Sequence, residues 1–359
     1  MRALLDAHHA RADARRSGAD VAMNGPIASI DALEGVIGKT PGAMHLKVID
    51  HLDAGALRWI AAAPLMFAGF GSGAGMSVTL GGGAPGFTEA GTRELCLPPA
   101  ALDDPALARP GEAFGSLLLV PGIGETLRVN GRVTEAGPDG IRIAVEECYG
   151  HCAKALIRSD LWAAAPVADA PDDPAAFVAV SRFLALATFG EERRADLSPK
   201  GDPAGCMARL DGDTLWFADR PGNRRVDSFR NILTQPRVAL VLLIPGANRV
   251  AIVRGTAHLT TDEDARARFE VQGKTPLLAI GIKVEAIDLR ASPALERAAL
   301  WPVKPDAHGI EPAKLFVEHI KLNRNAGLAG KLASAALAVP GMQGLLKKGL
   351  DKDYRDNLY

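Results

Sequence analysis

The amino-acid sequence predicts a β-rich α+β protein in which one unit occurs twice in tandem. Short runs of β-branched and other apolar residues, bounded by Pro and Gly, recur along the chain, as at 238–244, 250–253 and 278–284. Such runs are typical of β-barrels and related all-β folds with a few added helices. In addition, two long parts of the chain share blocks of sequence in the same order, which predicts a duplicated domain.

The repeat consists of three pairs of matching blocks. These pairs are 82–86 with 201–205, 118–131 with 242–255, and 145–162 with 284–301. The second pair preserves a Leu-Leu-x-Pro-Gly turn, and the third pair ends at a tryptophan in both copies. Chance similarity would not keep the order of three blocks. We therefore expect a repeated unit of roughly 120–135 residues, which is a normal domain size.

Composition and the repeat divide the chain into four parts. We expect an N-terminal extension at 1–40, a first domain at 41–165, a second domain at 172–302 and a helical C-terminal tail at 303–359. A linker rich in small residues, Pro and Asp separates the two domains. Apolar residues at helical spacing in 313–320 and 332–337 indicate the helices of the tail.

Bulk composition excludes several classes of protein. The net charge of −1 offers no basis for binding nucleic acid, and the hydrophobic content of 48% is sufficient for packed cores. No apolar stretch is long enough to span a membrane, and the first residues lack the apolar segment of a signal peptide. The four cysteines are too sparse for a disulfide scaffold. We therefore expect a cytoplasmic protein.

The segment 217–228 is the most informative part of the sequence. It places Arg220, Arg224 and Arg225 around a Pro-Gly turn that follows a strand-like run and precedes a helix-like run. A turn that opens a helix presents free N–H groups and the positive end of the helix dipole. Arginines beside such a turn add charged donors, so the segment predicts a phosphate pocket. The alternative reading of such a cluster is a solvated basic turn.

The two repeats differ at this point and at two others. Gly86 to Pro121 spans 35 residues in the first repeat, whereas Gly205 to Pro245 spans 40 in the second. The missing residues fall where the second repeat has its arginine-rich turn. Conversely, the polar segments 124–128 and 151–154 of the first repeat have become 248–252 and 290–293 in the second, with Ile252 in place of Arg128 and Pro293 in place of Lys154. Each repeat has therefore lost a different polar segment.

Several of these segments resemble the pyridoxamine 5′-phosphate oxidase family of split-barrel flavoproteins, in its broad FMN-binding branch. The matching segments are 125–131 and 151–162 in the first repeat, and 198–203, 218–228 and 236–238 in the second. The resemblance covers both repeats and is most specific at Asp-Arg-Pro-Gly-Asn-Arg-Arg. It implies a six-stranded split β-barrel that dimerises and holds FMN at the dimer interface. One subunit takes the phosphate, and the partner covers the rest of the cofactor.

The resemblance also implies which residues bind the cofactor. The second repeat carries the phosphate side, which consists of Ser198, Lys200, Asp219, Arg220, Asn223, Arg224, Arg225 and Ser228. The first repeat carries the partner side, which consists of Arg128, Lys154 and Arg158. The two split barrels are therefore expected to form a pseudo-dimer within one chain, with one composite flavin site and one degenerate site. The whole chain would then be a monomer or a homodimer of such pseudo-dimers.

The function implied by the resemblance is that of an FMN-dependent oxidoreductase of unknown substrate. Its electron donor would be a small molecule such as NAD(P)H, and no residue can be named as a catalytic acid or base. Two alternatives stay open: a flavin-binding carrier or sensor without turnover, and a split barrel that binds haem or a deazaflavin. No metal site is expected, because Cys148-x2-His151-Cys152 has no second ligand pair nearby.

Overall fold

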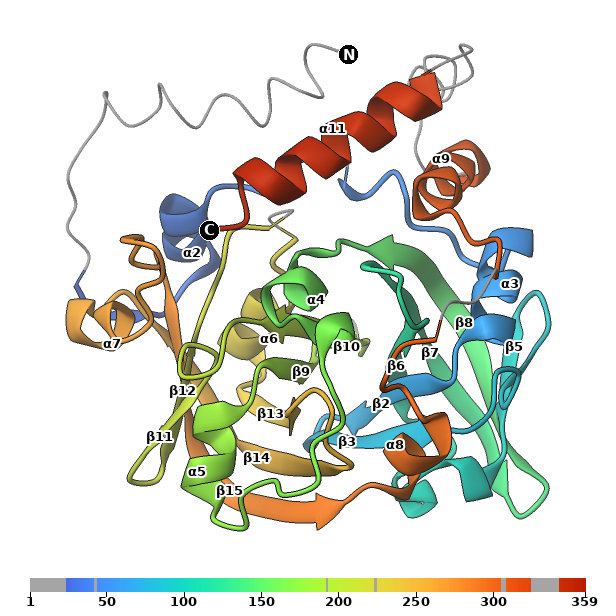
Figure 1. Ribbon diagram of the computed structural model, residues 1–359, viewed down its shortest axis with the longest axis horizontal. Coiled ribbons are helices and arrows are strands. Elements are labelled where there is room, and N and C mark those ends of the chain that lie inside the picture. Colours follow the sequence, from blue (N-terminus) through green and yellow to red (C-terminus); the bar gives the residue numbers. More distant parts are fainter. Residues whose placement is uncertain (1–23, 42–43, 192, 223–224, 305–307, 324–341) are drawn as a thin grey trace.

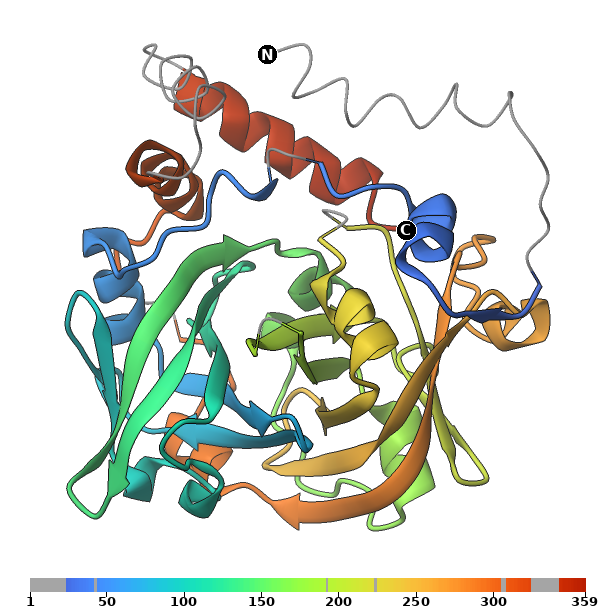
Figure 2. The ribbon, with the colours of Figure 1, turned by 180° about the vertical axis from the view of Figure 1, so that it is seen from behind.

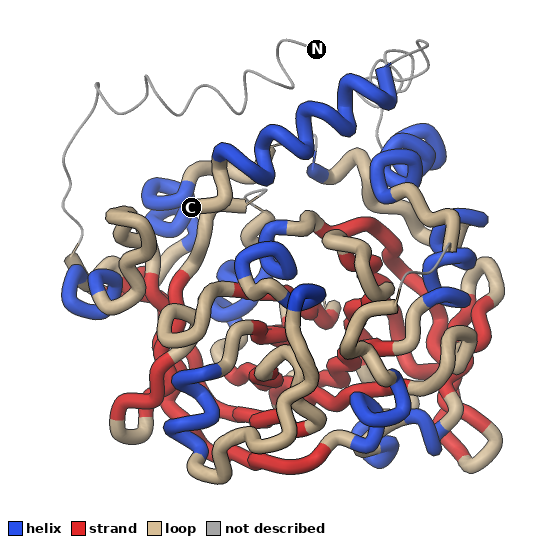
Figure 3. The backbone as a smooth tube through the Cα atoms, viewed as in Figure 1, coloured by secondary structure: helices blue, strands red, loops and turns tan. Residues whose placement is uncertain are grey.

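The structure is a computed structural model that describes residues 24–41, 44–191, 193–222, 225–304, 308–323 and 342–359. Its described strands form two antiparallel sheets that lie against each other, with most helices at the periphery (Figures 1 and 3). Within these described ranges, no helix is long and apolar enough to cross a membrane.

Each sheet is built from one of the two repeats. The first sheet contains β2 Leu65–Ser72, β3 Gly75–Gly82, β4 Glu89–Ala90, β5 Glu94–Leu97, β6 Ala113–Leu119, β7 Thr126–Gly137 and β8 Gly140–His151. The second contains β9 Phe183–Phe189, β10 Ala195–Gly201, β11 Arg209–Asp211, β12 Thr214–Ala218, β13 Arg237–Leu243, β14 Arg249–Thr260 and β15 Ala279–Ala291. A short strand from the N-terminal extension, β1 Pro26–Ile27, pairs with β14.

The two sheets have the same topology. The strand order is β3-β2-β6-β7-β8-β5-β4 in the first sheet and β10-β9-β13-β14-β15-β12-β11 in the second. Strand β2 therefore corresponds to β9, β3 to β10, and so on in sequence order up to β8 and β15. Both long hairpins shift register just before a glycine, Gly131 in β7 and Gly255 in β14. A Cβ at either glycine would lie under 3.0 Å from a carbonyl oxygen of the neighbouring strand. Residues matched by the sequence repeat therefore occupy equivalent positions.

The expectation of two split barrels is confirmed only as far as two β-rich units, each built around one antiparallel sheet. The described strands form two open antiparallel sheets, because the strands at the ends of each order have no hydrogen-bonded partner that would close a barrel. Each sheet curves around its own apolar core, which includes Leu240 and Phe217 in the second repeat and Leu118 and Phe114 in the first.

A third apolar cluster joins the two sheets. It contains buried side chains from β2, β3 and β6 together with side chains from β9, β10 and β13, and Phe67 of β2 contacts Phe183 of β9 with ring centroids 5.4 Å apart. Two glycines allow close packing across this junction. A Cβ on Gly201 of β10 would collide with the backbone of Ala155, and one on Gly82 of β3 would collide with the backbone of Ala294. The contacts are reciprocal, since each repeat packs a short helix on an end strand of the other.

The helices surround this junction. They are α2 Ile30–Ile37, α3 Ala54–Ala62, α4 Lys154–Arg158, α5 Pro174–Val180, α6 Asp227–Thr234, α7 Glu263–Ala267, α8 Pro293–Ala298, α9 Pro312–Leu322 and α11 Met342–Asp356. Short 3-10 turns lie at 99–101, 105–107 and 161–163. The helix α4 rests on β10 of the other repeat. In the tail, α9 and α11 contact each other, and α11 runs across the top of the molecule so that the segment after it ends beside the second repeat (Figures 1 and 2).

Candidate functional site

The structure brings the described members of the expected site together where the two repeats meet. Arg128 comes from β7, whereas Lys154 and Arg158 come from α4, all in the first repeat. Ser198 and Lys200 lie on β10 of the second repeat, and the arginine-rich turn leads from β12 into α6, which carries Ser228. Asn223 and Arg224 lie outside the described residues.

Arg128 makes the central link between the two repeats. Its side chain is 1% exposed and forms an ion pair with Asp196 of β10. It also donates to the Leu197 carbonyl and, over 3.2 Å, to the Ser198 hydroxyl. On its own side of the junction it donates to the Tyr149 hydroxyl over 2.7 Å. One buried guanidinium therefore holds a strand of each repeat in a fixed relation.

Two serines complete the surroundings of Asp196. Ser198 donates to the Asp196 carboxylate over 2.8 Å, and Ser228 donates to the same oxygen over 2.9 Å. The two hydroxyl oxygens lie 2.6 Å apart. Because all three groups are buried, the carboxylate is satisfied by charge-assisted hydrogen bonds from both repeats.

The three described cations that the second repeat contributes to the expected site are each paired with an aspartate. Lys200 lies 3.6 Å from the Asp219 carboxylate, and Arg220 donates to the Asp202 carboxylate over 2.6 Å. Arg225 forms an ion pair with Asp227, at the first residue of α6. The guanidinium of Arg225 also lies over the ring of Tyr149 from the first repeat, 4.2 Å from its centroid.

Lys154 and Arg158 are buried and contact the end of the C-terminal tail. Lys154 donates to the Asn357 carbonyl over 2.9 Å, and Arg158 donates to the Leu358 carbonyl over 2.6 Å. Arg158 also donates to the carbonyl of Pro221 in the arginine-rich turn over 2.5 Å. Arg158 therefore reaches the arginine-rich turn of the other repeat, whereas the contacts of Lys154 are with the tail.

Burial shifts the pKa of several groups around this cluster. Burial raises the pKa of Asp202 to about 6, although the Arg220 guanidinium opposes the shift. Burial lowers the pKa of Lys47 to about 8, and Lys47 donates to the Gly150 carbonyl over 2.7 Å. Burial, together with the Arg128 and Lys47 cations, holds the pKa of His151 well below its usual range. At neutral pH the imidazole is therefore neutral, while the arginines keep their charge.

A cavity of about 410 Å³ opens beside the cluster. Asn130, Glu147 and Tyr149 line it from the first repeat, and Asp196, Arg225 and Asp227 line it from the second. Its size falls within the range of about 300–1,000 Å³ that is common for sites of small ligands and cofactors. The cavity lies between the repeats, so its walls depend on both of them.

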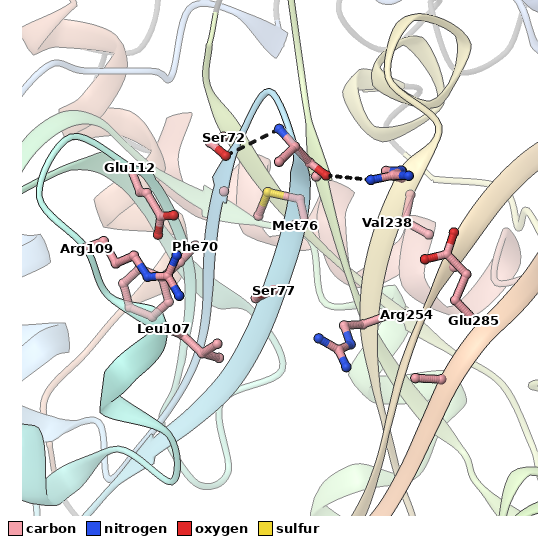
Figure 4. A pocket seen from close by; sticks show the side chains of 16 residues that line it. Phe70, Ser72, Met76, Ser77, Leu107, Arg109, Glu112, Val238, Arg254 and Glu285 are labelled. Carbon is pink, nitrogen blue, oxygen red and sulfur yellow. Dashed lines mark hydrogen bonds between the residues drawn. The ribbon is translucent and has the colours of Figure 1, made fainter.

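A second cavity, of about 500 Å³, lies at the equivalent place of the other half (Figure 4). Arg254 and Ala286 line it where Asn130 and Glu147 line the first cavity, and Ser77 lies where Asp196 does. Arg237 is one of its charged lining residues, and Figure 4 shows Arg109 and Glu112 on one side of the cavity and Arg254 and Glu285 on the other. The positions of Arg128 and Tyr149 are taken by Ile252 and Asp288 in this half.

Sequence reasoning named Asp219 but missed Asp196, Asp202 and Asp227, and it missed the contacts that the tail makes with the site. Asp196 could have been found from the repeat, since the pair Arg128 and Asp196 becomes Ile252 and Ser77 in the other half. No pattern in the sequence pointed to the contacts of residues 353–359 with α4. The arginine-rich turn, by contrast, lies where its strand–turn–helix pattern placed it.

Comparison with known proteins supports the resemblance for the second repeat. The profile of the family described as Pyridoxamine 5′-phosphate oxidase matches residues 171–291. No curated protein matches the chain.

Several solved structures are similar to about a third of the chain. HupZ of Group A Streptococcus has 19% identity over 32% of this chain and 88% of its own, with a TM-score of 0.26. An F420 reductase has 19% identity over 33% of this chain and 98% of its own, with a TM-score of 0.26. A putative pyridoxamine 5′-phosphate oxidase of Lactobacillus delbrueckii has 22% identity over 30% of this chain and 84% of its own, with a TM-score of 0.24. At these TM-scores the similarities establish no shared function.

Proposed function

We propose that this chain binds FMN in one composite site and acts as an oxidoreductase, since the profile of the pyridoxamine 5′-phosphate oxidase family matches residues 171–291. The observation that carries the proposal is the meeting of two sets of cations at the junction. Arg128, Lys154 and Arg158 of the first repeat converge with Lys200, Arg220 and Arg225 of the second. This division matches the one that the resemblance implies for a dimer of split barrels.

The charge of the cluster suits a phosphate monoester. In the described part of the site, four of the six cations pair with Asp196, Asp202, Asp219 and Asp227 of the second repeat. Lys154 pairs instead with Asp353 of the tail. Without the tail, the formal excess is two positive charges, which equals the charge of a phosphate monoester dianion. Among the described residues, Arg128 Nε and Arg220 Nη2 are buried and have no hydrogen-bond partner. Such nitrogens can donate to phosphate oxygens, so the donor set fits the group.

We propose that the two repeats arose by tandem duplication and form a pseudo-dimer of split barrels. The equal strand order, the equal register shifts and the reciprocal packing of α4 and α8 support this. The domain limits that follow are those expected from the sequence, 41–165 and 172–302. Only the junction beside β10 keeps the phosphate turn, so only that junction is expected to bind a flavin tightly.

The cavity beside the cluster is proposed to take the organic part of the cofactor. Bound FMN supplies the redox chemistry, while the protein supplies binding, orientation and electrostatics. Arg225 and the Tyr149 ring form one wall, with the phenol kept protonated because burial raises the pKa of Tyr149 above its usual range. The neutral His151 and the cation of Arg128 lie on the first-repeat side. None of these groups is assigned as a catalytic acid or base.

Spectroscopy of the purified protein separates this function from its two alternatives. A flavin absorption band that bleaches on addition of NAD(P)H supports the oxidoreductase. A flavin band that no donor bleaches favours a carrier or sensor, and a Soret band or a deazaflavin spectrum favours the third class of protein. If the protein, purified and reconstituted with FMN, holds no flavin after gel filtration, the proposed function is wrong.

The first prediction concerns stoichiometry. We expect one tightly bound FMN per chain, because the second cavity has Ile252 and Asp288 in place of Arg128 and Tyr149 and the first repeat has no arginine-rich turn. Absorbance of the reconstituted protein, combined with amino-acid quantitation, measures the ratio. A ratio of two would contradict the composite-site arrangement, whereas a ratio near one agrees with it.

The second prediction uses the internal repeat as its control. Arg158 and Arg297 occupy equivalent positions in α4 and α8, but Arg158 reaches the arginine-rich turn, whereas Arg297 donates to the carbonyls of Gly82 and Ala101. Losing a charge-assisted contact costs about 1.5–3 kcal/mol, so Arg158→Ala should weaken FMN binding by about tenfold or more. Arg297→Ala should leave the FMN dissociation constant nearly unchanged. Fluorescence titration of FMN measures both, and equal losses in the two variants would argue against the site.

A further inference from the structure

We propose that residues 353–359 form a strap that occupies the cationic site and must leave before a phosphate-bearing ligand can bind. The proposal rests on the proposed function, because it names what competes with FMN for its site. The strap consists of the last turn of α11 and the three residues that follow it. It contacts α4 of the first repeat at Arg158 and the arginine-rich turn of the second repeat at Arg220.

The strap supplies oxygen atoms to Lys154. The ammonium group lies 2.9 Å from the Asp353 carboxylate and donates to the Asn357 carbonyl over 2.9 Å. The Asn357 side chain donates back to Asp353 over 3.0 Å, which ties the end of the helix to the residues after it. Lys154 is only 4% exposed. The strap's oxygens therefore occupy the positions around its ammonium group that water or a ligand would otherwise take.

The strap engages Arg158 in the same manner. The Leu358 carbonyl accepts hydrogen bonds from both Nε and Nη2 of Arg158, a fork that a phosphate oxygen could equally occupy. The Tyr359 ring lies 5.4 Å from the Arg158 guanidinium and 5.5 Å from that of Arg220, so it contacts a cation from each repeat. Lys274 donates to the Tyr359 carbonyl over 2.7 Å.

Within the strap, Tyr354 holds the last turn of α11 at a separate point. The Tyr354 hydroxyl lies 3.3 Å from the Glu125 carboxylate and accepts from the Ala153 amide over 3.4 Å. Ala153 immediately precedes α4, so α11 is attached beside the two cations rather than on them. The strap can therefore lose its contacts with Lys154 and Arg158 while α11 keeps its contact with the first repeat.

The chemistry of the strap makes it a substitute for the ligand. It presents carboxylate and carbonyl oxygens to an ammonium and a guanidinium, the same donors that a phosphate requires. The donors that Lys154 and Arg158 give to the strap are not available to a phosphate at the same time. The apparent dissociation constant of the ligand is therefore the intrinsic constant divided by the fraction of molecules in which the strap is released.

The test compares two variants of the full chain. Asp353→Ala with Tyr359→Ala removes the strap's ion pair and its contact with Arg158 and Arg220. Lys352→Ala is the control, because it removes an exposed charged residue of the same helix that lies just before the strap. We expect the double variant to bind FMN about tenfold more tightly than the unchanged chain, which corresponds to a strap released in about one molecule in ten. The control should bind FMN as the unchanged chain does.

Hydrogen exchange of a peptide that contains residues 353–359 gives a second readout. FMN should increase exchange in this peptide of the unchanged chain, since binding displaces the strap. Equal or weaker FMN binding by the double variant, or greater protection of the peptide with FMN, would overturn the strap and show instead that it completes the site. Failure of every protein to bind FMN is a different result, because it overturns the proposed function and the competition with it.

Discussion

Replacing Arg128 with isoleucine is expected to lower the free energy of unfolding by about 3–5 kcal/mol. The substitution removes the cation from a buried ion pair and leaves the Asp196 carboxylate, itself 5% exposed, with only the two serine hydroxyls. An uncompensated buried charge is among the most costly defects of a protein interior. Urea denaturation of the apo protein, followed by circular dichroism, measures the loss.

The chain offers its own control for this prediction. At the equivalent positions, the other half carries Ile252 and Ser77, so the fold already tolerates an apolar residue facing a serine there. The double variant Arg128→Ile with Asp196→Ser rebuilds that pair, and we expect it to recover at least half of the lost free energy. FMN affinity should stay low in both variants, because neither restores the cation. If the double variant is no more stable than Arg128→Ile alone, the unpaired charge of Asp196 is not the cause of the lost stability, and the prediction is wrong.

The internal repeat made much of this arrangement predictable. Blocks that kept their order implied two copies of one domain. The resemblance to dimeric split barrels, together with the differences between the copies, implied that the cations would meet across a junction. The resemblance placed Arg128, Lys154 and Arg158 on the partner side of a composite site. In the structure, Arg128 contacts Ser198 and Arg158 contacts Pro221 of the second repeat. A repeated sequence carries spatial information, because equivalent residues must occupy equivalent places if both copies fold alike.

The partners of these cations could not be predicted in the same way. Asp202 lies eighteen residues before Arg220, and nothing in the local sequence shows that β10 and the turn bring them to 2.6 Å. The contact of Leu358 with Arg158 joins residues 200 positions apart. Such pairings are set by how strands and helices pack in three dimensions. Hydrophobic periodicity and turn-forming residues predict only local structure, so they cannot predict these long-range contacts.

The close packing between the repeats leads to a prediction about two glycines. We expect Gly201→Ala and Gly82→Ala each to lower the free energy of unfolding by about 3 kcal/mol. Neither glycine has a positive φ, so alanine fits the backbone itself. The cost comes from the new methyl group, which would lie under 3.0 Å from the backbone of Ala155 or Ala294. Backbone atoms cannot rotate away as a side chain can, so the short helix has to move. Gly137→Ala is the matched control, since no atom lies within 4 Å of a Cβ there.

Gly201→Ala and Gly82→Ala should lower the free energy of unfolding by similar amounts but should differ in their affinity for FMN. Gly201→Ala pushes against α4, which carries Lys154 and Arg158, so it should weaken FMN binding by about tenfold, the effect of losing one charge-assisted contact. Gly82→Ala pushes against α8, which carries Pro293 and Arg297 at those positions and lies beside the degenerate site. Its FMN dissociation constant should stay close to that of the unchanged chain. Thermal unfolding together with FMN titration gives both quantities. Equal loss of affinity in the two variants would mean that the sites are not divided between the repeats as proposed, even if the packing at the junction is correct.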